Sequence, residues 1–74
     1  MKVKKILDWI LKKNYTIHNF NFYHHESEPC LEVYVFVNDD KQCVFVSLSG
    51  ASLNKKNFKH VLISRAKEMG YKIQ

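Results

Sequence analysis

The first thirteen residues combine hydrophobic and polar positions with the period of an α-helix. One stripe with i, i+3, i+4, i+7 and i+8 spacing predicts an amphipathic helix over residues 3–13 and consists of Val3, Ile6, Leu7, Ile10 and Leu11. Lys4, Asp8 and Lys12 recur at four-residue spacing on the opposite face, where Asp8 can pair with either lysine.

Three stretches with a two-residue period come next, and this period predicts β-strands. Residues 15–23 form the first, and the apolar phase shifts near His18-Asn19, which predicts a β-bulge there. Residues 31–37 alternate most clearly, and residues 42–48 repeat the same alternation.

Polar segments separate these strands, and a second helix follows them. Residues 24–30 are polar and contain a proline, so a loop is expected there; residues 38–41 have turn chemistry. Asn54 is the expected N-cap of a helix from Lys55 to about Met69, and Gly70 is its expected left-handed C′ residue. The buried stripe of this helix is expected to consist of Phe58, Val61, Leu62, Ala66 and Met69.

The predicted fold class is α+β, in the order α-β-β-β-α, with a three-stranded antiparallel meander and both helices packed on one face. The aliphatic sheet face should meet the helices and consists of Leu31, Val33, Val35, Val37, Val44, Val46 and Leu48. The other face carries Tyr34, Phe36 and Phe45, an aromatic patch that predicts a homodimer or partner interface. A competing explanation is that the 24–30 loop or the tail at Tyr71 and Ile73 covers these rings.

Composition limits the class of protein. Seventy-four residues make one domain, 1–74, and 46% hydrophobic content argues against disorder. Cys30 and Cys43 lack metal-ligand spacing, so reduced thiols in a cytoplasmic protein are expected, with no metal and no cofactor. No stretch approaches the ~18 apolar residues of a membrane helix, so no membrane partner is expected.

The net charge of +5 is unevenly distributed along the chain. Residues 1–13 contain five lysines, whereas residues 14–40 contain five acidic residues and no lysine or arginine. Residues 41–74 contain seven basic residues and a single acidic one, Glu68. Such a distribution steers a polyanion toward one side of a molecule.

Lysines gather at the predicted start of the second helix. Lys55 and Lys56 occupy the first turn, where the helix dipole disfavours cations, and Lys59 and His60 follow one turn later. Free amides, a positive dipole end and three lysines together predict a phosphate-binding site, to which Lys4 and Lys12 of the first helix would add. The alternative interpretation is a solvated lysine cluster.

The order of elements and these lysines resemble the double-stranded RNA-binding domain. In that family a Lys-Lys-x-Ala-Lys motif binds phosphates, and Lys55, Lys56 and Lys59 stand at the lysine positions with Phe58 in place of the alanine. The family's Gly-Pro-x-His loop would fall at residues 28–31, which lack both the glycine and the histidine. The resemblance implies that RNA is the partner.

The chain also resembles HicA-type toxins, small basic proteins that cleave mRNA. Residues 53–62 follow the family's Leu-x-Lys-Gly-Thr-Leu/Phe-x-x-Ile-Leu pattern with Lys56 at the glycine, and His24-His25 matches its His-His pair. This resemblance implies an antitoxin partner and a metal-independent endoribonuclease. In that activity His24 or His25 would deprotonate a ribose 2′-hydroxyl as a general base, or protonate the leaving oxygen as a general acid, while Lys55 and Lys56 bind the phosphate. The alternative is that the two histidines have no role.

A protein-binding module is the alternative function. A lysine-rich first helix, then Asn-Tyr-Thr-Ile at residues 14–17 and a three-stranded sheet, is similar to some phage-encoded anti-CRISPR inhibitors. The aromatic patch and the acidic segment 26–40 favour this alternative, in which a host protein is bound, whereas the charge of +5 disfavours mimicry of DNA.

Overall fold

The order of elements along the chain is α-β-β-β-α, as predicted. The computed structural model describes residues 2–37 and 43–71. Its elements are α1 (Lys2–Lys12), β1 (Thr16–His25), β2 (Glu28–Phe36), β3 (Val44–Ser49), the short 3₁₀-helix η1 (Gly50–Ser52) and α2 (Lys55–Glu68). The predicted turn at 38–41 and the end of the tail at Ile73 lie outside the described residues.

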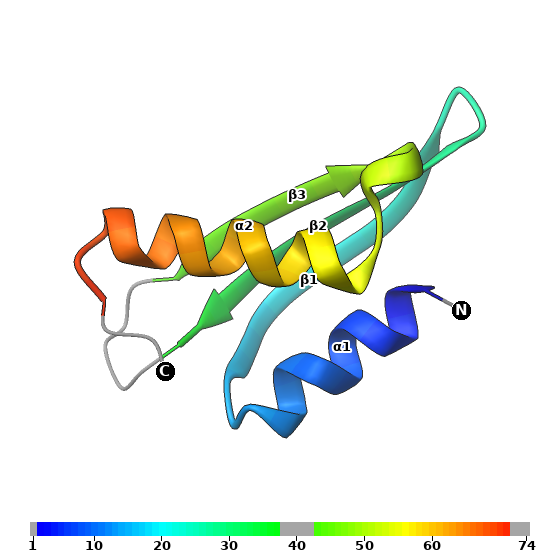
Figure 1. Cartoon of the computed structure of the whole chain (residues 1–74). Coiled ribbons are helices and arrows are strands. Elements are labelled where there is room, and N and C mark those ends of the chain that lie inside the picture. The colour runs from blue at the N-terminus through cyan, green and yellow to red at the C-terminus, as the bar shows by residue number, and fades with distance from the viewer. Residues whose placement is uncertain (1, 38–42, 72–74) are drawn as a thin grey trace.

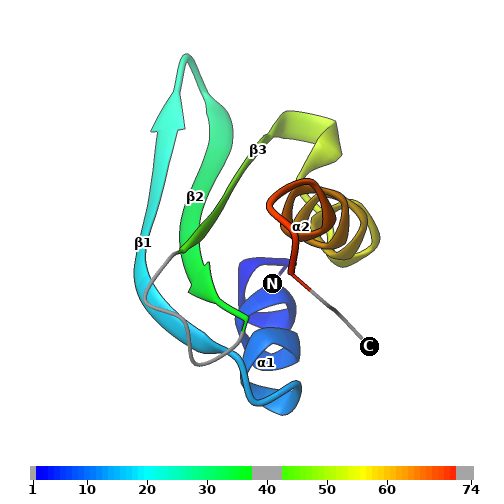
Figure 2. The same cartoon turned by 90° about the vertical axis from the view of Figure 1, so that its left-hand side faces the viewer.

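The three strands form one antiparallel sheet in the order β1-β2-β3. Both helices lie on the same face of this sheet, and no helix of the described residues covers the other face, as Figures 1 and 2 show. The predicted bulge is present, because the β1–β2 register shifts between Ile17 and Asn19.

Alternation along the strands creates the core. The side chains of β2 and β3 that face the helices are almost fully buried: Leu31, Val33, Val35, Val44, Val46 and Leu48. The helices add Ile6 and Ile10 from α1, and Phe58, Leu62 and Ala66 from α2. This part of the prediction is confirmed, and Val37 packs against the same core in a half-buried position.

The buried stripe of α1 differs from the predicted one. Leu11 was expected in the core but is 59% exposed, whereas Trp9 is only 9% exposed. The reason is the second helix, which lies beside α1 and covers the flank that carries Trp9. In α2, Met69 was also expected in the core, but it follows the last helical turn and is 44% exposed.

The segment 24–30 is not a loop, so that prediction is wrong. β1 continues to His25, β2 begins at Glu28, and only Glu26 and Ser27 form the turn. Both turn residues have positive φ angles, 50° and 68°, which is typical of a tight type I′ hairpin. Neither is glycine or asparagine, which explains why the turn has no clear signal in the sequence.

The predicted caps of α2 are confirmed. The Asn54 side chain accepts a hydrogen bond from the Asn57 amide at 2.8 Å. At the other end Gly70 has φ 87° and donates to the Lys67 carbonyl, while the Tyr71 amide donates to the Ala66 carbonyl at 2.9 Å. These two bonds make a Schellman motif. Tyr71 packs against the core on the helix side, so it does not cover the aromatic patch.

Candidate nucleic-acid interface

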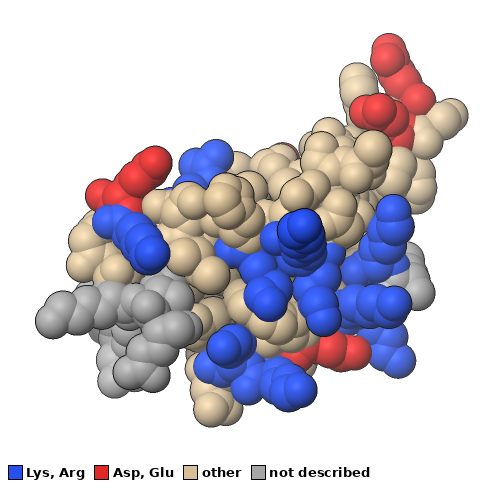
Figure 3. Space-filling view, viewed as in Figure 1, with Lys and Arg blue, Asp and Glu red and all other residues tan. Residues whose placement is uncertain are grey.

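A groove between the two helices collects lysines from both of them. It has a volume of about 360 Å³ and is lined by Lys5, Asp8, Trp9, Lys12 and Lys55. Lys5, Asp8 and Lys12 occupy one side of α1 at helical spacing, and Lys55 opens α2 on the facing side. Figure 3 shows basic side chains concentrated on the helix-bearing side of the molecule, with few acidic ones among them.

Trp9 joins this groove to the core. Its ring makes edge-to-face contacts with Tyr15 at 5.9 Å and with Phe58 at 6.2 Å between ring centroids. The Nζ atom of Lys59 lies 5.7 Å from the centroid of the same ring, within the range of a cation–π interaction. Trp9 of α1 thus contacts both Phe58 and Lys59 of α2, and Lys59 lies beside the groove that Trp9 lines.

The N-terminus of α2 adds a positive dipole end to these charges. The Asn54 cap engages the Asn57 amide, and Lys55 and Lys56 occupy the exposed first turn with no acidic residue beside them in that turn. None of the groove lysines pairs with a carboxylate of the described part of the chain. Positive charges held together without partners favour the binding of an anion.

The structure brings some of the predicted lysines together and leaves others apart. Lys12 and Lys55 line the groove, and Lys59 lies over its Trp9. Lys4 is one position off the groove-lining side of α1, while Lys56 and His60 are exposed on α2 without lining the groove. Lys5 and Trp9 also line the groove, although neither was among the predicted site residues. The signal for them was the second stripe of α1 at i, i+3, i+4 and i+7, formed by Lys5, Asp8, Trp9 and Lys12.

His24 and His25 do not converge on one site. They are successive residues at the end of β1, so their side chains emerge on opposite faces of the hairpin. His24 pairs with Pro29 and its ring contacts Phe22 on the helix side, whereas His25 pairs with Glu28 on the other side. Neither histidine lines the groove between the helices.

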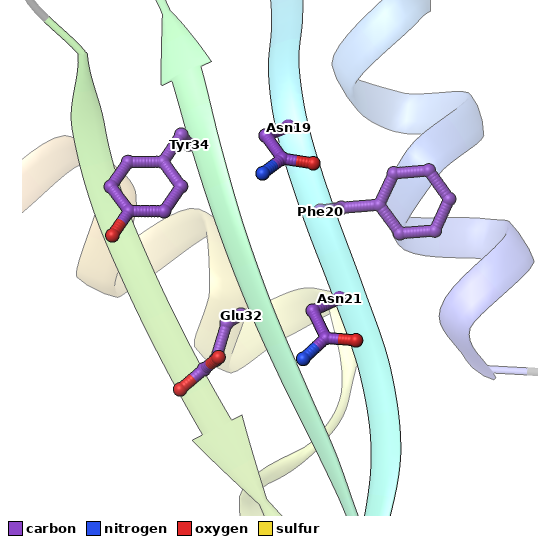
Figure 4. A pocket seen from close by; sticks show the side chains of 5 residues that line it. All are labelled: Asn19, Phe20, Asn21, Glu32 and Tyr34. Carbon is purple, nitrogen blue, oxygen red and sulfur yellow. The ribbon is translucent and has the colours of Figure 1, made fainter.

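The helix-free sheet face carries the aromatic patch that the sequence predicts. Tyr34 is 41% exposed and its ring lies 4.8 Å from that of Phe45, its partner on β3. Phe36 is half-buried and contacts His18 at 5.2 Å. Beside Tyr34 lies a trough of about 370 Å³ that is lined mainly by polar groups of β1 and β2, shown in Figure 4.

The same face carries the carboxylate of Glu32. The Tyr23 hydroxyl donates to Glu32 at 3.4 Å, and the Glu32 carboxylate raises the pKa of Tyr23 above its ordinary value, with desolvation and Cys30 adding to the effect. In the described residues, the outward positions of the three strands carry no lysine or arginine. The lysine-rich helix side and the sheet face that carries Glu32 are thus opposite faces of the molecule.

Comparison of the chain with protein-family models, with curated proteins and with solved structures finds no match. Within the described ranges, no three His, Cys, Asp or Glu side chains are placed to hold a metal ion. Cys30 is buried and Cys43 half-buried, both as free thiols. Neither α1 nor α2 has the length and apolar character needed to span a membrane.

Proposed function

We propose that this protein binds RNA, with the groove between α1 and α2 as its phosphate-binding site. The observation that carries the proposal is the convergence of Lys5, Lys12 and Lys55 from two helices on one groove. Lys59 adds a fourth charge over Trp9. The resemblance of Lys55, Lys56 and Lys59 to the phosphate-binding motif of double-stranded RNA-binding domains supports the same function.

The form of the groove favours a duplex over a single strand. Single-stranded nucleic acids are usually bound by stacking their bases on exposed aromatic rings. Trp9, the aromatic ring of this groove, is 9% exposed and already packed against Tyr15 and Phe58, so it offers no free face. The groove is therefore suited to contacts with the backbone of a duplex.

Asp8 supplies a reason to favour RNA over DNA. A carboxylate among lysines repels phosphate, but it can accept a hydrogen bond from a ribose 2′-hydroxyl, a donor that DNA lacks. We expect Asp8→Asn to narrow the difference in affinity between an RNA duplex and a DNA duplex of the same sequence.

Two triple variants with equal charge test the proposal. The groove variant is Lys5→Ala, Lys12→Ala and Lys55→Ala, and the control variant is Lys4→Ala, Lys13→Ala and Lys67→Ala, which removes three exposed lysines outside the groove. Fluorescence anisotropy with a labelled RNA duplex should show at least a tenfold greater loss for the groove variant. Equal losses would mean that net charge alone drives binding, and the proposal would be wrong.

Cleavage of RNA by a histidine stays a prediction. If it occurs on the helix side, His24 is the residue in position to act, because His25 faces the other way. Wild-type protein should then cleave RNA without added metal, and His24→Ala should stop cleavage while His25→Ala does not. Intact RNA after prolonged incubation with the wild type would exclude the activity.

A protein-binding module is the second candidate, favoured by the neighbouring rings of Tyr34, which is 41% exposed, and the half-buried Phe45 on the sheet face that carries Glu32. A phage-type inhibitor acting through this face would use Tyr34, Phe36 and Phe45 and would not need the groove. Tyr34→Ser separates the two functions. If the protein binds RNA through the groove, this variant should bind RNA as tightly as the wild type. If the protein is an inhibitor that acts through the sheet face, the groove lysines should contribute nothing to RNA binding even in the wild type.

A further inference from the structure

The outer edge of β1 is a second feature that the proposed function does not use. In the described part of the chain β1 pairs with β2 along one edge, and no strand pairs with its other edge. Natural proteins usually protect such edges with lysine, proline or very short strands, because unpaired amides and carbonyls recruit other strands. β1 has ten residues, none of them charged and none of them proline.

The bulge at His18 interrupts only the start of this edge. From Asn19 to His25 the register with β2 is regular. Seven residues of regular strand span roughly 24 Å. The other edge strand, β3, has six residues and packs against α2.

Exposed hydrophobic side chains flank the same edge. Phe20 pairs with the buried Val33, so it belongs to the helix side of the sheet, yet it is 47% exposed. Figure 4 shows its ring beyond the outer edge of β1, on the side away from β2. Leu11 is 59% exposed and lies one turn beyond Leu7 on α1.

The geometry of α1 places Leu11 on this side of the molecule. Trp9, Lys5 and Lys12 occupy the flank of α1 that faces α2. Leu7 and Leu11 lie on the opposite flank of the helix, beside Ile10 of the buried face, and therefore turn toward the open edge of the sheet. Leu11 and Phe20 are thus exposed on the same flank of the molecule as the unpaired edge of β1.

We propose that β1 pairs antiparallel with β1 of a second copy of this chain, forming a two-fold dimer with a continuous six-stranded sheet. A two-fold interface must be self-complementary. The net charge of +5 makes two copies repel each other over most of their surface, but β1 contains no lysine, arginine, aspartate or glutamate, so two copies of this strand can pair without repulsion between like charges. Phe20 and Leu11 of each copy would cover the helix side of the junction.

The size of the flank is consistent with a second copy. The molecule measures 36 by 22 by 20 Å along its principal axes. A flank of these dimensions offers at most roughly 700–800 Å² per partner, close to the ~800 Å² of a standard interface. The basic groove lies on the other flank of α1 and stays open in the dimer. The interface also differs from the Tyr34, Phe36 and Phe45 patch that the sequence predicts.

Sedimentation of the full chain under reducing conditions, from about 1 to 500 µM, tests the proposal. Wild type should dimerise within this range. The double variant Leu11→Ser and Phe20→Ser should weaken dimerisation at least tenfold. The matched control, Tyr34→Ser and Met69→Ser, removes two hydrophobic side chains that are exposed elsewhere, at 41% and 44%, and should leave dimerisation unchanged.

Two further readouts belong to the same experiment. Added salt should strengthen the dimer, because it screens the repulsion between two positively charged copies. Hydrogen exchange should slow for β1 amides as protein concentration rises, while β3 amides exchange as before. A wild type that is monomeric at 500 µM overturns the proposal, and so does a dimer that the control variant disrupts as much as the Leu11/Phe20 variant.

Discussion

Alanine substitutions at Trp9 and Leu11 test which of the two side chains is buried. The sequence pattern of α1 predicts that Leu11 is buried and Trp9 is not, whereas the structure shows the reverse. Trp9 is 9% exposed and contacts the rings of Tyr15 and Phe58, whereas Leu11 is 59% exposed. Truncation of a buried tryptophan costs about 3–5 kcal/mol. The two edge-to-face contacts account for ~0.5–1.5 kcal/mol each and the Lys59 cation–π interaction for ~0.5–1 kcal/mol.

These losses are large for a chain of this length. At ~0.05–0.15 kcal/mol per residue, a domain of 74 residues has a free energy of unfolding of roughly 4–11 kcal/mol. Trp9→Ala should therefore remove about half of it and lower Tm by at least ~12 °C. Leu11→Ala should cost less than about 1 kcal/mol, because most of that side chain is already in water.

Urea unfolding followed by far-ultraviolet circular dichroism measures both losses, since Trp9 is the only tryptophan and its fluorescence disappears with the substitution. A protein concentration near 1 µM keeps the proposed dimer from contributing. Trp9→Phe, which keeps a ring at the site, should fall between wild type and Trp9→Ala. Equal losses for Trp9→Ala and Leu11→Ala, or a larger loss for Leu11→Ala, would refute the packing of α1 described above.

Three further predictions concern local structure. Ser27→Gly should raise the free energy of unfolding by about 0.5–1 kcal/mol in the same urea assay, because φ is 68° at this position and glycine has no steric cost there; a loss would contradict the hairpin turn. Asn54→Ala should cost about 1 kcal/mol by removing the 2.8 Å cap of α2, and Asn54→Ser should recover most of it. Glu32→Gln should lower the pKa of Tyr23 toward its ordinary value near 10, seen as phenolate absorbance in a spectroscopic titration. Because the pKa of Tyr23 is raised in the folded state, its contribution to stability is complete below pH ~10 and is lost as pH rises through the raised pKa. An unchanged titration curve for Glu32→Gln would show that another group causes the shift.

Strand alternation made the architecture predictable, and the errors have local physical causes. Leu31 to Val37 and Val44 to Leu48 alternate so regularly that only one sheet face can receive the helices. The hairpin was missed because Glu26 and Ser27 take positive φ angles that glycine or asparagine would normally announce. Leu11 fits the periodic stripe of α1, but no helix or strand of residues 2–37 and 43–71 covers its flank, whereas α2 covers Trp9.

The candidate site was only partly predictable for a similar reason. Lys55, Lys56 and Lys59 stand out in sequence because they break the charge preference of a helix start. Which lysines of α1 join them depends on the rotation of α1 against α2, and a one-residue difference selects Lys5 instead of Lys4. The separation of His24 and His25 likewise follows from the extension of β1, which places successive residues on opposite faces.

The salt dependence of RNA binding measures how many phosphates the groove between α1 and α2 contacts. Each phosphate contact in a duplex contributes about −0.9 to the slope of log affinity against log salt concentration. Contacts from Lys5, Lys12, Lys55 and Lys59 predict a slope near −3.6 for the wild type, and removal of the first three should reduce it to roughly −1. The control variant that lacks Lys4, Lys13 and Lys67 should keep the wild-type slope. Identical slopes for wild type and the groove variant would contradict phosphate binding between the two helices.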